Sequence, residues 1–81
     1  MLIIKILGGG CANCKNLEAI THEVVNTLDL QAEFIKVMDH NEIMKYPILS
    51  TPGLVINEQL VSAGRIPSKI EIEGWLKKTV G

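Results

Sequence analysis

The feature that most constrains the fold is a short apolar segment, LIIKIL (residues 2–7), which leads directly into three glycines and a CANC motif. Its nearly continuous run of β-branched and leucine side chains is typical of a strand covered on both faces. Gly8, Gly9 and Gly10 can adopt backbone conformations closed to other residues, so the chain can turn sharply there. The segment therefore predicts a buried strand, a tight turn and a helix that begins at the cysteines.

The middle of the chain alternates between helical and extended patterns. Apolar residues recur at helical spacing from residue 14 to residue 28, which predicts a long first helix that ends near Asp29. Residues 32–39 are rich in strand-forming side chains. Residues 40–46 predict a short helix closed by Pro47, because the residue before a proline avoids the helical conformation.

The last third predicts a hairpin followed by a helix. Residues 53–57 and 60–63 are short strands separated by only two residues, Glu58 and Gln59, which favours an antiparallel pair. Ser68 and Glu71 form a capping box that marks the start of the final helix. The expected order is β-α-β-α-β-β-α, an α/β fold with a four-stranded mixed sheet flanked by helices. Its first two strands should run parallel, joined by a right-handed crossover.

Length and composition exclude several classes of protein. The chain has 81 residues, 47% of them hydrophobic, so we expect residues 1–81 to form a single globular domain, and Phe34, Met38 and Met44 to lie at core-like positions. The net charge is −1 and no run of Lys or Arg occurs, so the sequence lacks the positive charge that nucleic-acid-binding proteins use. No apolar run approaches the length of a membrane span, and the first strand lacks the features of a signal peptide. We expect a cytoplasmic monomer, in which two cysteines indicate redox chemistry or metal binding rather than a structural disulfide.

The spacing of the cysteines makes the two sulfurs unequal. If Cys11 begins the helix, Cys14 lies one turn later on nearly the same face, with Cβ atoms about 5–6 Å apart. Small changes in the backbone at a helix start can shorten this distance to the roughly 3.8 Å that separates the Cβ atoms of a disulfide. The unpaired N–H groups at the helix start should lower the pKa of Cys11, and Lys15 adds positive charge nearby, whereas burial opposes ionisation of Cys14. We therefore expect Cys11 to attack a disulfide and Cys14 to resolve the mixed disulfide.

Two other functions fit parts of the motif. A phosphate-binding loop is not supported, because the glycines are not followed by Gly-Lys-Ser/Thr. A soft-metal module remains the alternative, since two thiolates suit Cu(I). Copper-chaperone domains, however, end on a strand, whereas this chain should end on a helix. Zinc would need two further ligands, and the only histidines, His22 and His40, are expected to face solvent. We expect no bound metal.

The residues GGGCANCK, followed about forty residues later by TPGLVIN and a hairpin into a last helix, resemble the thioredoxin superfamily. The chain is most similar to its small archaeal and bacterial members, the glutaredoxin-like thioredoxins. The resemblance implies a thioredoxin fold and a thiol–disulfide oxidoreductase whose redox-active disulfide, Cys11–Cys14, needs no other cofactor. It also implies client proteins with disulfides and a thioredoxin-reductase-like electron donor.

Further site residues follow from the resemblance alone. Pro52 would follow a cis peptide bond and lie beside the two cysteines. The backbone of Thr51 would pair with an extended substrate peptide. Ala63 and Gly64 would line the other side of that groove.

The chain departs from typical thioredoxins near the cysteines. Gly10 replaces an aromatic residue before the first cysteine, so substrate docking should be less hydrophobic, and no proline stands between the cysteines. Lys5 replaces the buried acid six residues before the first cysteine, and we expect it to be a structural, partly exposed strand residue. The segment AGRIPSK offers Arg65 and Lys69 but no paired acids for glutathione, which favours protein disulfides as substrates.

Overall fold

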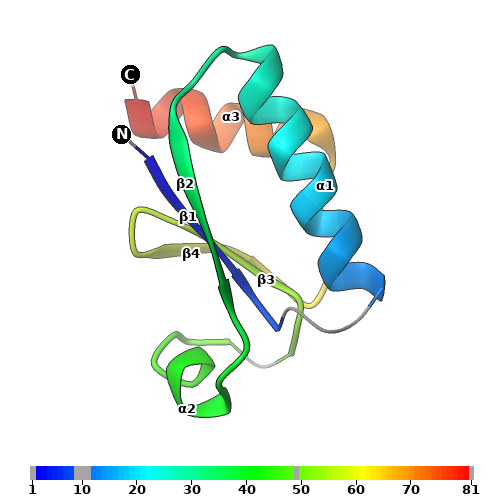
Figure 1. Ribbon diagram of the computed structural model, residues 1–81, viewed down its shortest axis with the longest axis vertical. Helices are drawn as coiled ribbons and strands as arrows, with labels where there is room; N and C mark the ends of the chain where they lie inside the picture. Colours follow the sequence, from blue (N-terminus) through cyan, green and yellow to red (C-terminus); the bar gives the residue numbers. More distant parts are fainter. Residues whose placement is uncertain (1, 9–11, 49, 81) are drawn as a thin grey trace.

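The predicted order of elements is confirmed in the computed structural model, which describes residues 2–8, 12–48 and 50–80 (Figure 1). Four strands and three helices follow one another as β-α-β-α-β-β-α. Their bounds are β1 (Leu2–Leu7), α1 (Ala12–Thr27), β2 (Ala32–Val37), α2 (His40–Ile43), β3 (Gly53–Ile56), β4 (Gln59–Ala63) and α3 (Lys69–Val80).

The four strands form one mixed sheet in the order β2-β1-β3-β4. β1 runs parallel to β2 and antiparallel to β3, and β3 runs antiparallel to β4. A parallel pair needs a long crossover connection, and α1 supplies it. The mixed four-stranded sheet predicted from the sequence is therefore confirmed.

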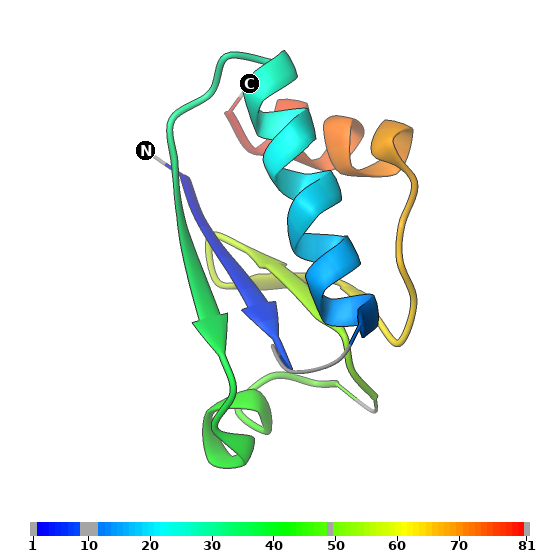
Figure 2. The same cartoon turned by 45° about the vertical axis from the view of Figure 1, so that its right-hand side comes forward.

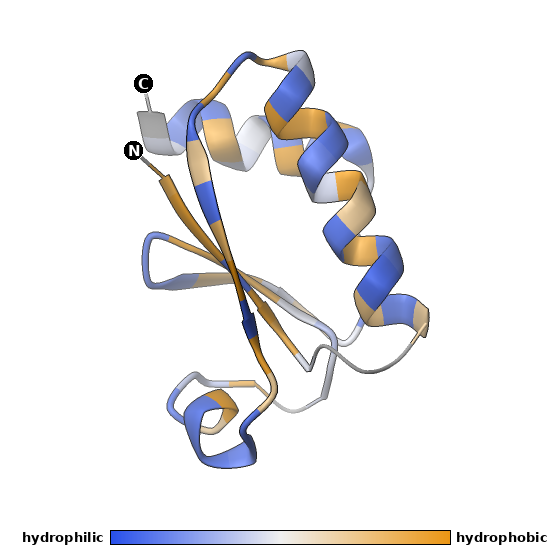
Figure 3. Cartoon of the chain, viewed as in Figure 1, coloured by the Kyte–Doolittle hydropathy of each residue, from blue (hydrophilic) through white to orange (hydrophobic). Residues whose placement is uncertain are grey.

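Helices α1 and α3 lie side by side on one face of the sheet (Figures 1 and 2). Successive strand residues point to opposite faces, so the even-numbered residues of β1 point toward these helices. Orange and blue alternate along α1 in Figure 3, as expected for a helix with one buried face. Ten buried residues form the core here: Leu2, Ile4, Ile6, Leu17, Val24, Val25, Leu54, Ile56, Ile72 and Leu76.

The opposite face is covered only at one end, where α2 lies (Figure 1). The predicted helix over residues 40–46 ends at Ile43 and is a single turn. Four buried residues form the core on this side: Leu7, Ile43, Ile48 and Val55. Farther along β1, the Ile3 side chain is 37% exposed. Helices thus flank both faces, as expected, but very unequally.

The hairpin turn lies one residue earlier than predicted. Asn57 and Glu58 form it, with φ values of 49° and 69°, the left-handed pair that a tight hairpin requires. Asn57 favours this position because asparagine tolerates the left-handed conformation. Its side-chain oxygen accepts a hydrogen bond from the Ile3 N–H at 2.9 Å, and its own N–H donates to the Ile3 carbonyl at 2.8 Å. These bonds to β1 fix the register.

Two of the three expected core residues are exposed. Met38 is 67% exposed and Met44 is 58% exposed, so that prediction is wrong for both. They flank a one-turn helix, which is too short to turn either side chain inward. Phe34 is half-buried against the core of the helical face, as expected. Its ring stacks on that of His22, with centroids 3.6 Å apart and planes inclined by 17°.

The capping box of α3 is confirmed. The Ser68 hydroxyl accepts from the Glu71 N–H, and the Glu71 carboxylate accepts from the Ser68 N–H, both at 3.2 Å. Arg65 donates to both oxygens of the same carboxylate, at 2.7 and 3.1 Å. These contacts lower the pKa of the Glu71 carboxyl to about 2, chiefly through its hydrogen bonds to Arg65.

Candidate functional site

The register of the sheet brings two distant segments to the same edge. Leu7, the last residue of β1, lies opposite Gly53, the first residue of β3. Because these strands are antiparallel, the turn that follows β1 and the loop that precedes β3 meet. The N-terminal end of α1 lies at this same end of the sheet (Figures 1 and 2). Cys14, in the first turn of α1, and the Thr51–Pro52 segment are therefore carried to one end of the molecule.

Cys14 lies in the first turn of α1 and is 1% exposed, so its expected burial is observed. Lys15, beside it, is exposed. Cys11 and Gly10 lie outside the described residues. The pairing of the two sulfurs, the nucleophilic role of Cys11 and the supporting roles of Gly10 and Lys15 therefore stay predictions.

The loop before β3 has the form that the resemblance implied. The Thr51–Pro52 peptide bond is cis. Pro52 is buried, whereas Thr51 is exposed. Gly8 has a φ of 88°, and a Cβ atom there would lie 2.7 Å from the Cβ and Cγ2 atoms of Thr51. The absence of a side chain at Gly8 therefore allows the turn after β1 to lie against Thr51.

Gly64 closes the other side of this loop. Its N–H donates to the Pro52 carbonyl at 2.9 Å. It has a φ of 75°, which favours glycine, and a Cβ atom there would collide with the Ser50 hydroxyl. The structure thus brings together Thr51, Pro52 and Gly64, the three residues for which the family resemblance implied substrate binding.

The backbone of Thr51 is open to a partner. Within residues 2–8, 12–48 and 50–80, no group forms a hydrogen bond with its N–H or its carbonyl. An unpaired backbone segment beside a sheet is a template for an added strand. This geometry suits the peptide-pairing role expected of Thr51.

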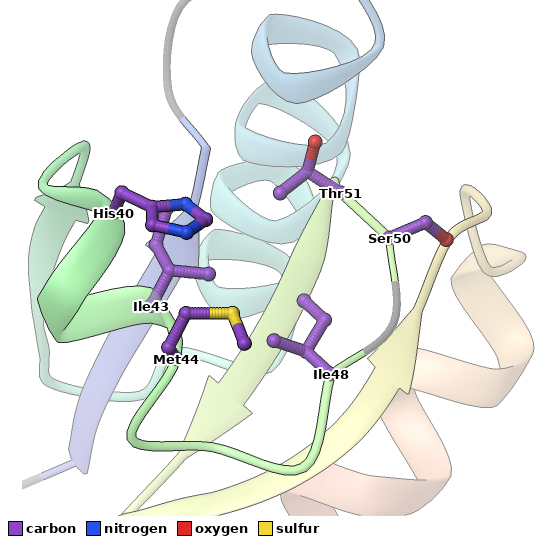
Figure 4. Close-up of a pocket in the computed structure, with 6 residues that line it drawn as sticks. All are labelled: His40, Ile43, Met44, Ile48, Ser50 and Thr51. Carbon is purple, nitrogen blue, oxygen red and sulfur yellow. The ribbon is translucent and has the colours of Figure 1, made fainter.

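A pocket that the sequence did not reveal adjoins Thr51. Its volume is about 260 Å³ (Figure 4). The pocket lies between α2 and the segment that leads to β3, and sequence periodicity does not predict how Met44, Ile48 and Ser50 come together there. The apolar character of Ile43 and Ile48 was the only signal in the sequence. Its lining residues are His40, Ile43, Met44, Ile48, Ser50 and Thr51.

Lys5 has the structural, partly exposed role predicted for it. Its side chain is 22% exposed and forms an ion pair with Glu58, with an N–O distance of 2.5 Å. It also donates to the Tyr46 hydroxyl at 3.0 Å. The hydrogen bond to Glu58 is the main reason why the pKa of Lys5 is raised, and the same bond lowers the pKa of Glu58. As an odd-numbered residue of β1, Lys5 points to the face opposite α1 and Cys14.

The described residues hold no group of three or more His, Cys, Asp or Glu side chains that could ligate a metal ion. His22 and His40 are both exposed, as expected. The helices of the described segments are also too short or too polar to cross a membrane.

Comparison with known proteins agrees with this geometry. A family model described as a thioredoxin domain matches residues 2–77. A thioredoxin from Methanothermobacter thermautotrophicus is 40% identical over 73 residues, which cover 90% of this chain and 95% of that protein. A thioredoxin from Methanocaldococcus jannaschii is 38% identical over 77 residues, which cover 95% of this chain and 88% of that protein. This chain therefore belongs to the thioredoxin family, a family of thiol–disulfide oxidoreductases.

Proposed function

We propose that this chain reduces disulfide bonds of client proteins through a Cys11–Cys14 dithiol–disulfide couple. The main support is the burial of Cys14 in the first turn of α1, at the sheet end where Thr51 is exposed and where no described residue pairs with the Thr51 backbone. A resolving thiol has to be shielded from solvent and from other disulfides while the first thiol reacts. At 1% exposure, Cys14 meets that requirement.

In the first step, the Cys11 thiolate attacks one sulfur of the client disulfide. The client S–S bond breaks, one client thiolate leaves and takes up a proton from water, and a mixed disulfide joins Cys11 to the client. The positive end of α1 favours the thiolate form of a cysteine at its start.

In the second step, Cys14 loses its proton and attacks the Cys11 sulfur. The mixed disulfide breaks, and the second client thiolate leaves and takes up a proton. The client has then gained two electrons and two protons, and the chain holds the Cys11–Cys14 disulfide. No bound cofactor takes part, and Lys5 does not act as the proton acceptor because it points to the other face of the sheet.

Client binding uses the backbone of Thr51 as an edge on which an extended peptide adds. Gly8 and Gly64 flank this segment closely, and neither projects a side chain over it. Main-chain pairing gives little preference among sequences, which suits a reductase with several clients. A thioredoxin-reductase-like protein returns the chain to the dithiol form, and we propose that the chain works as a monomer in the cytoplasm.

The test is a redox titration of the wild-type chain and of a Cys14→Ser variant. Glutathione buffers set potentials from about −270 to about −120 mV, and alkylation then traps free thiols. We expect the wild type to convert between a dithiol and an internal disulfide within that range and to reduce a disulfide-bonded test protein. We expect Cys14→Ser to accumulate a mixed disulfide with that protein, and Cys11→Ser, the matched control, to form none.

The same titration separates the alternatives. An absence of internal disulfide at every potential, together with tight Cu(I) binding, would favour a metal-binding module instead. Turnover with glutathione mixed disulfides that exceeds turnover with protein disulfides would reverse the proposed substrate preference.

A further inference from the structure

We propose that another pocket, between the β3–β4 turn and the last turn of α3, binds a small aromatic carboxylate. It lies at the end of β3 opposite to Gly53 and Thr51, on the side of the molecule away from the start of α1 (Figures 1 and 2). This site is separate from the redox site and does not depend on the proposed function. The described residues that line it are Asn57, Gln59, Val61, Trp75, Lys78 and Thr79.

One wall of the pocket is apolar. Val61, on β4, and Trp75, on α3, are both half-buried and pack against the core of the helical face. The buried part of each side chain holds it in place, and part of its remaining surface lines the pocket. An indole ring favours stacked or edge-to-face contact with another aromatic ring. The wall therefore favours a planar aromatic occupant.

The described lining residues carry one positive charge and no negative charge. Lys78 is exposed, and no carboxylate of the described segments forms an ion pair with its ammonium group. The neighbouring Lys77, in contrast, pairs with Glu73 at 2.8 Å. The carbonyl end of α3 opposes an anion with about half a negative charge, but the full positive charge of Lys78 exceeds it. The rim of the pocket therefore favours an anion.

Asn57 adds a hydrogen-bond donor to this rim. Its side-chain oxygen accepts from the Ile3 N–H at 2.9 Å, and no described residue accepts a hydrogen bond from its NH₂ group. The Thr79 hydroxyl donates to the Trp75 carbonyl at 2.8 Å, so its proton is already used. A carboxylate only accepts hydrogen bonds, and bonds from an ammonium or amide donor to a charged acceptor are the stronger kind. The polar groups beside the indole thus suit a carboxylate.

The volume suits a free small molecule. Small-molecule sites occupy roughly 300–1,000 Å³, and this pocket, at about 410 Å³, lies in the lower part of that range. One aromatic ring can lie against Trp75 with its carboxylate directed toward Lys78. A neutral aromatic molecule would lack the ion pair, and a cation would be repelled by Lys78.

The test follows the fluorescence of Trp75, the only tryptophan, as benzoate is added to the wild-type protein. We expect saturable binding of benzoate and weaker binding of benzamide, which is neutral, and of cyclohexanecarboxylate, which is not aromatic. Benzylamine, which is cationic, should give no saturable response. The indole N–H signal of Trp75 in NMR spectra should shift over the same range of benzoate concentration.

Two pairs of variants locate the site. Lys78→Gln should weaken benzoate binding about two- to fivefold, the effect of an exposed ion pair. Lys77→Gln, its matched control, should bind like the wild type, because Lys77 does not line the pocket. Thr79→Glu, which adds a negative charge to the rim, should weaken binding more than Thr79→Gln, which is similar in size but neutral.

Three results would overturn the proposed site while leaving the reductase function intact. The first is equal binding of benzoate and benzamide, and the second is equal affinity of Lys78→Gln and Lys77→Gln for benzoate. The third is a Trp75 fluorescence that does not change saturably with any of the four probes.

Discussion

The two faces of the sheet are stabilised in different ways. On one face, α1 and α3 enclose ten buried apolar residues of the described segments in a single cluster. On the other, a one-turn helix covers four, and the neighbouring space is taken up by the hydrogen-bonded side chains of Lys5, Tyr46 and Glu58. Both faces belong to the same four strands. The difference in burial therefore comes from the segments that connect the strands, which cover one face more fully than the other.

This asymmetry indicates that one face of the sheet mainly stabilises the fold and the other provides a binding surface. The helical face holds most of the apolar burial, which is the main favourable term in folding. The α2 face is less filled, and the pocket beside Thr51 lies on it. A small chain can leave one face partly open only because the other contributes most of the stability.

The largest expected effect compares one buried residue from each face. Leu17→Ala, at 0% exposure on the helical face, should reduce the free energy of unfolding by about 2–5 kcal/mol. Ile43→Ala should cost about 2 kcal/mol or less, because a one-turn helix at the surface can collapse into the space created. Urea denaturation followed by the fluorescence of Trp75, the only tryptophan, measures both. Equal losses would show that the two faces contribute alike.

The helical face was largely predictable from the sequence. Its strand, turn and helix follow from local patterns, namely the apolar run of residues 2–7, the glycines after it and the helical spacing from Cys14 onward. The capping box of Ser68 and Glu71 is likewise local, since its partners are three residues apart. Patterns of this kind determine the element order, and with it the parallel pairing of the first two strands.

The open face was not predictable in the same way. Lys5 and Tyr46 are 41 residues apart in the sequence, so no local sequence pattern predicts their hydrogen bond. The prediction that Met38 and Met44 lie in the core was wrong, because hydrophobicity alone does not show that the helix between them ends after one turn. The peptide site lies between these cases, since Thr51, Pro52 and Gly64 were found through a family resemblance rather than through any physical signal in their spacing.

Two glycines offer the next comparison. Gly64 lies at the end of β4 beside the peptide groove, and Gly74 lies within α3 with open space where a Cβ atom would be placed. Gly64→Ala should lose about 1–2 kcal/mol of stability, because φ is positive there, and should slow disulfide reduction by displacing Ser50. Gly74→Ala should gain up to about 1 kcal/mol, since alanine is the better helix former, and leave the activity unchanged. Chemical denaturation and a disulfide-reduction assay test both variants, and a tolerated alanine at position 64 would contradict the close packing described.

The charged cluster of the open face should have a smaller effect. Lys5→Met removes the ion pair with Glu58 and the hydrogen bond to Tyr46. We expect the unfolding midpoint to change less than in Gly64→Ala, because partly exposed ion pairs contribute little to stability and are screened by salt. Tyr46→Phe, which removes only the hydroxyl, is the matched control. The rate of the Cys14 step, followed by thiol trapping of the mixed disulfide, should be unaffected, and a large change would assign Lys5 a part in the chemistry.

The smallest expected effect is a dependence of stability on pH to which one carboxylate from each face contributes. Glu71, at the start of α3, has a pKa lowered from its ordinary value of 4.5 to about 2, mainly by Arg65. The pKa of Glu58, on the open face, is also lowered, mainly by Lys5. A lowered pKa in the folded state adds stability above the ordinary value, and this is lost as acid protonates the unfolded chain first. The urea midpoint should therefore fall between about pH 4.5 and pH 2, and the fall should be smaller in Glu71→Gln and in Glu58→Gln. If Glu71→Gln leaves the acid profile unchanged, the Arg65 pair is too dynamic in solution to stabilise α3, and that part of the helical face is looser than its contacts suggest.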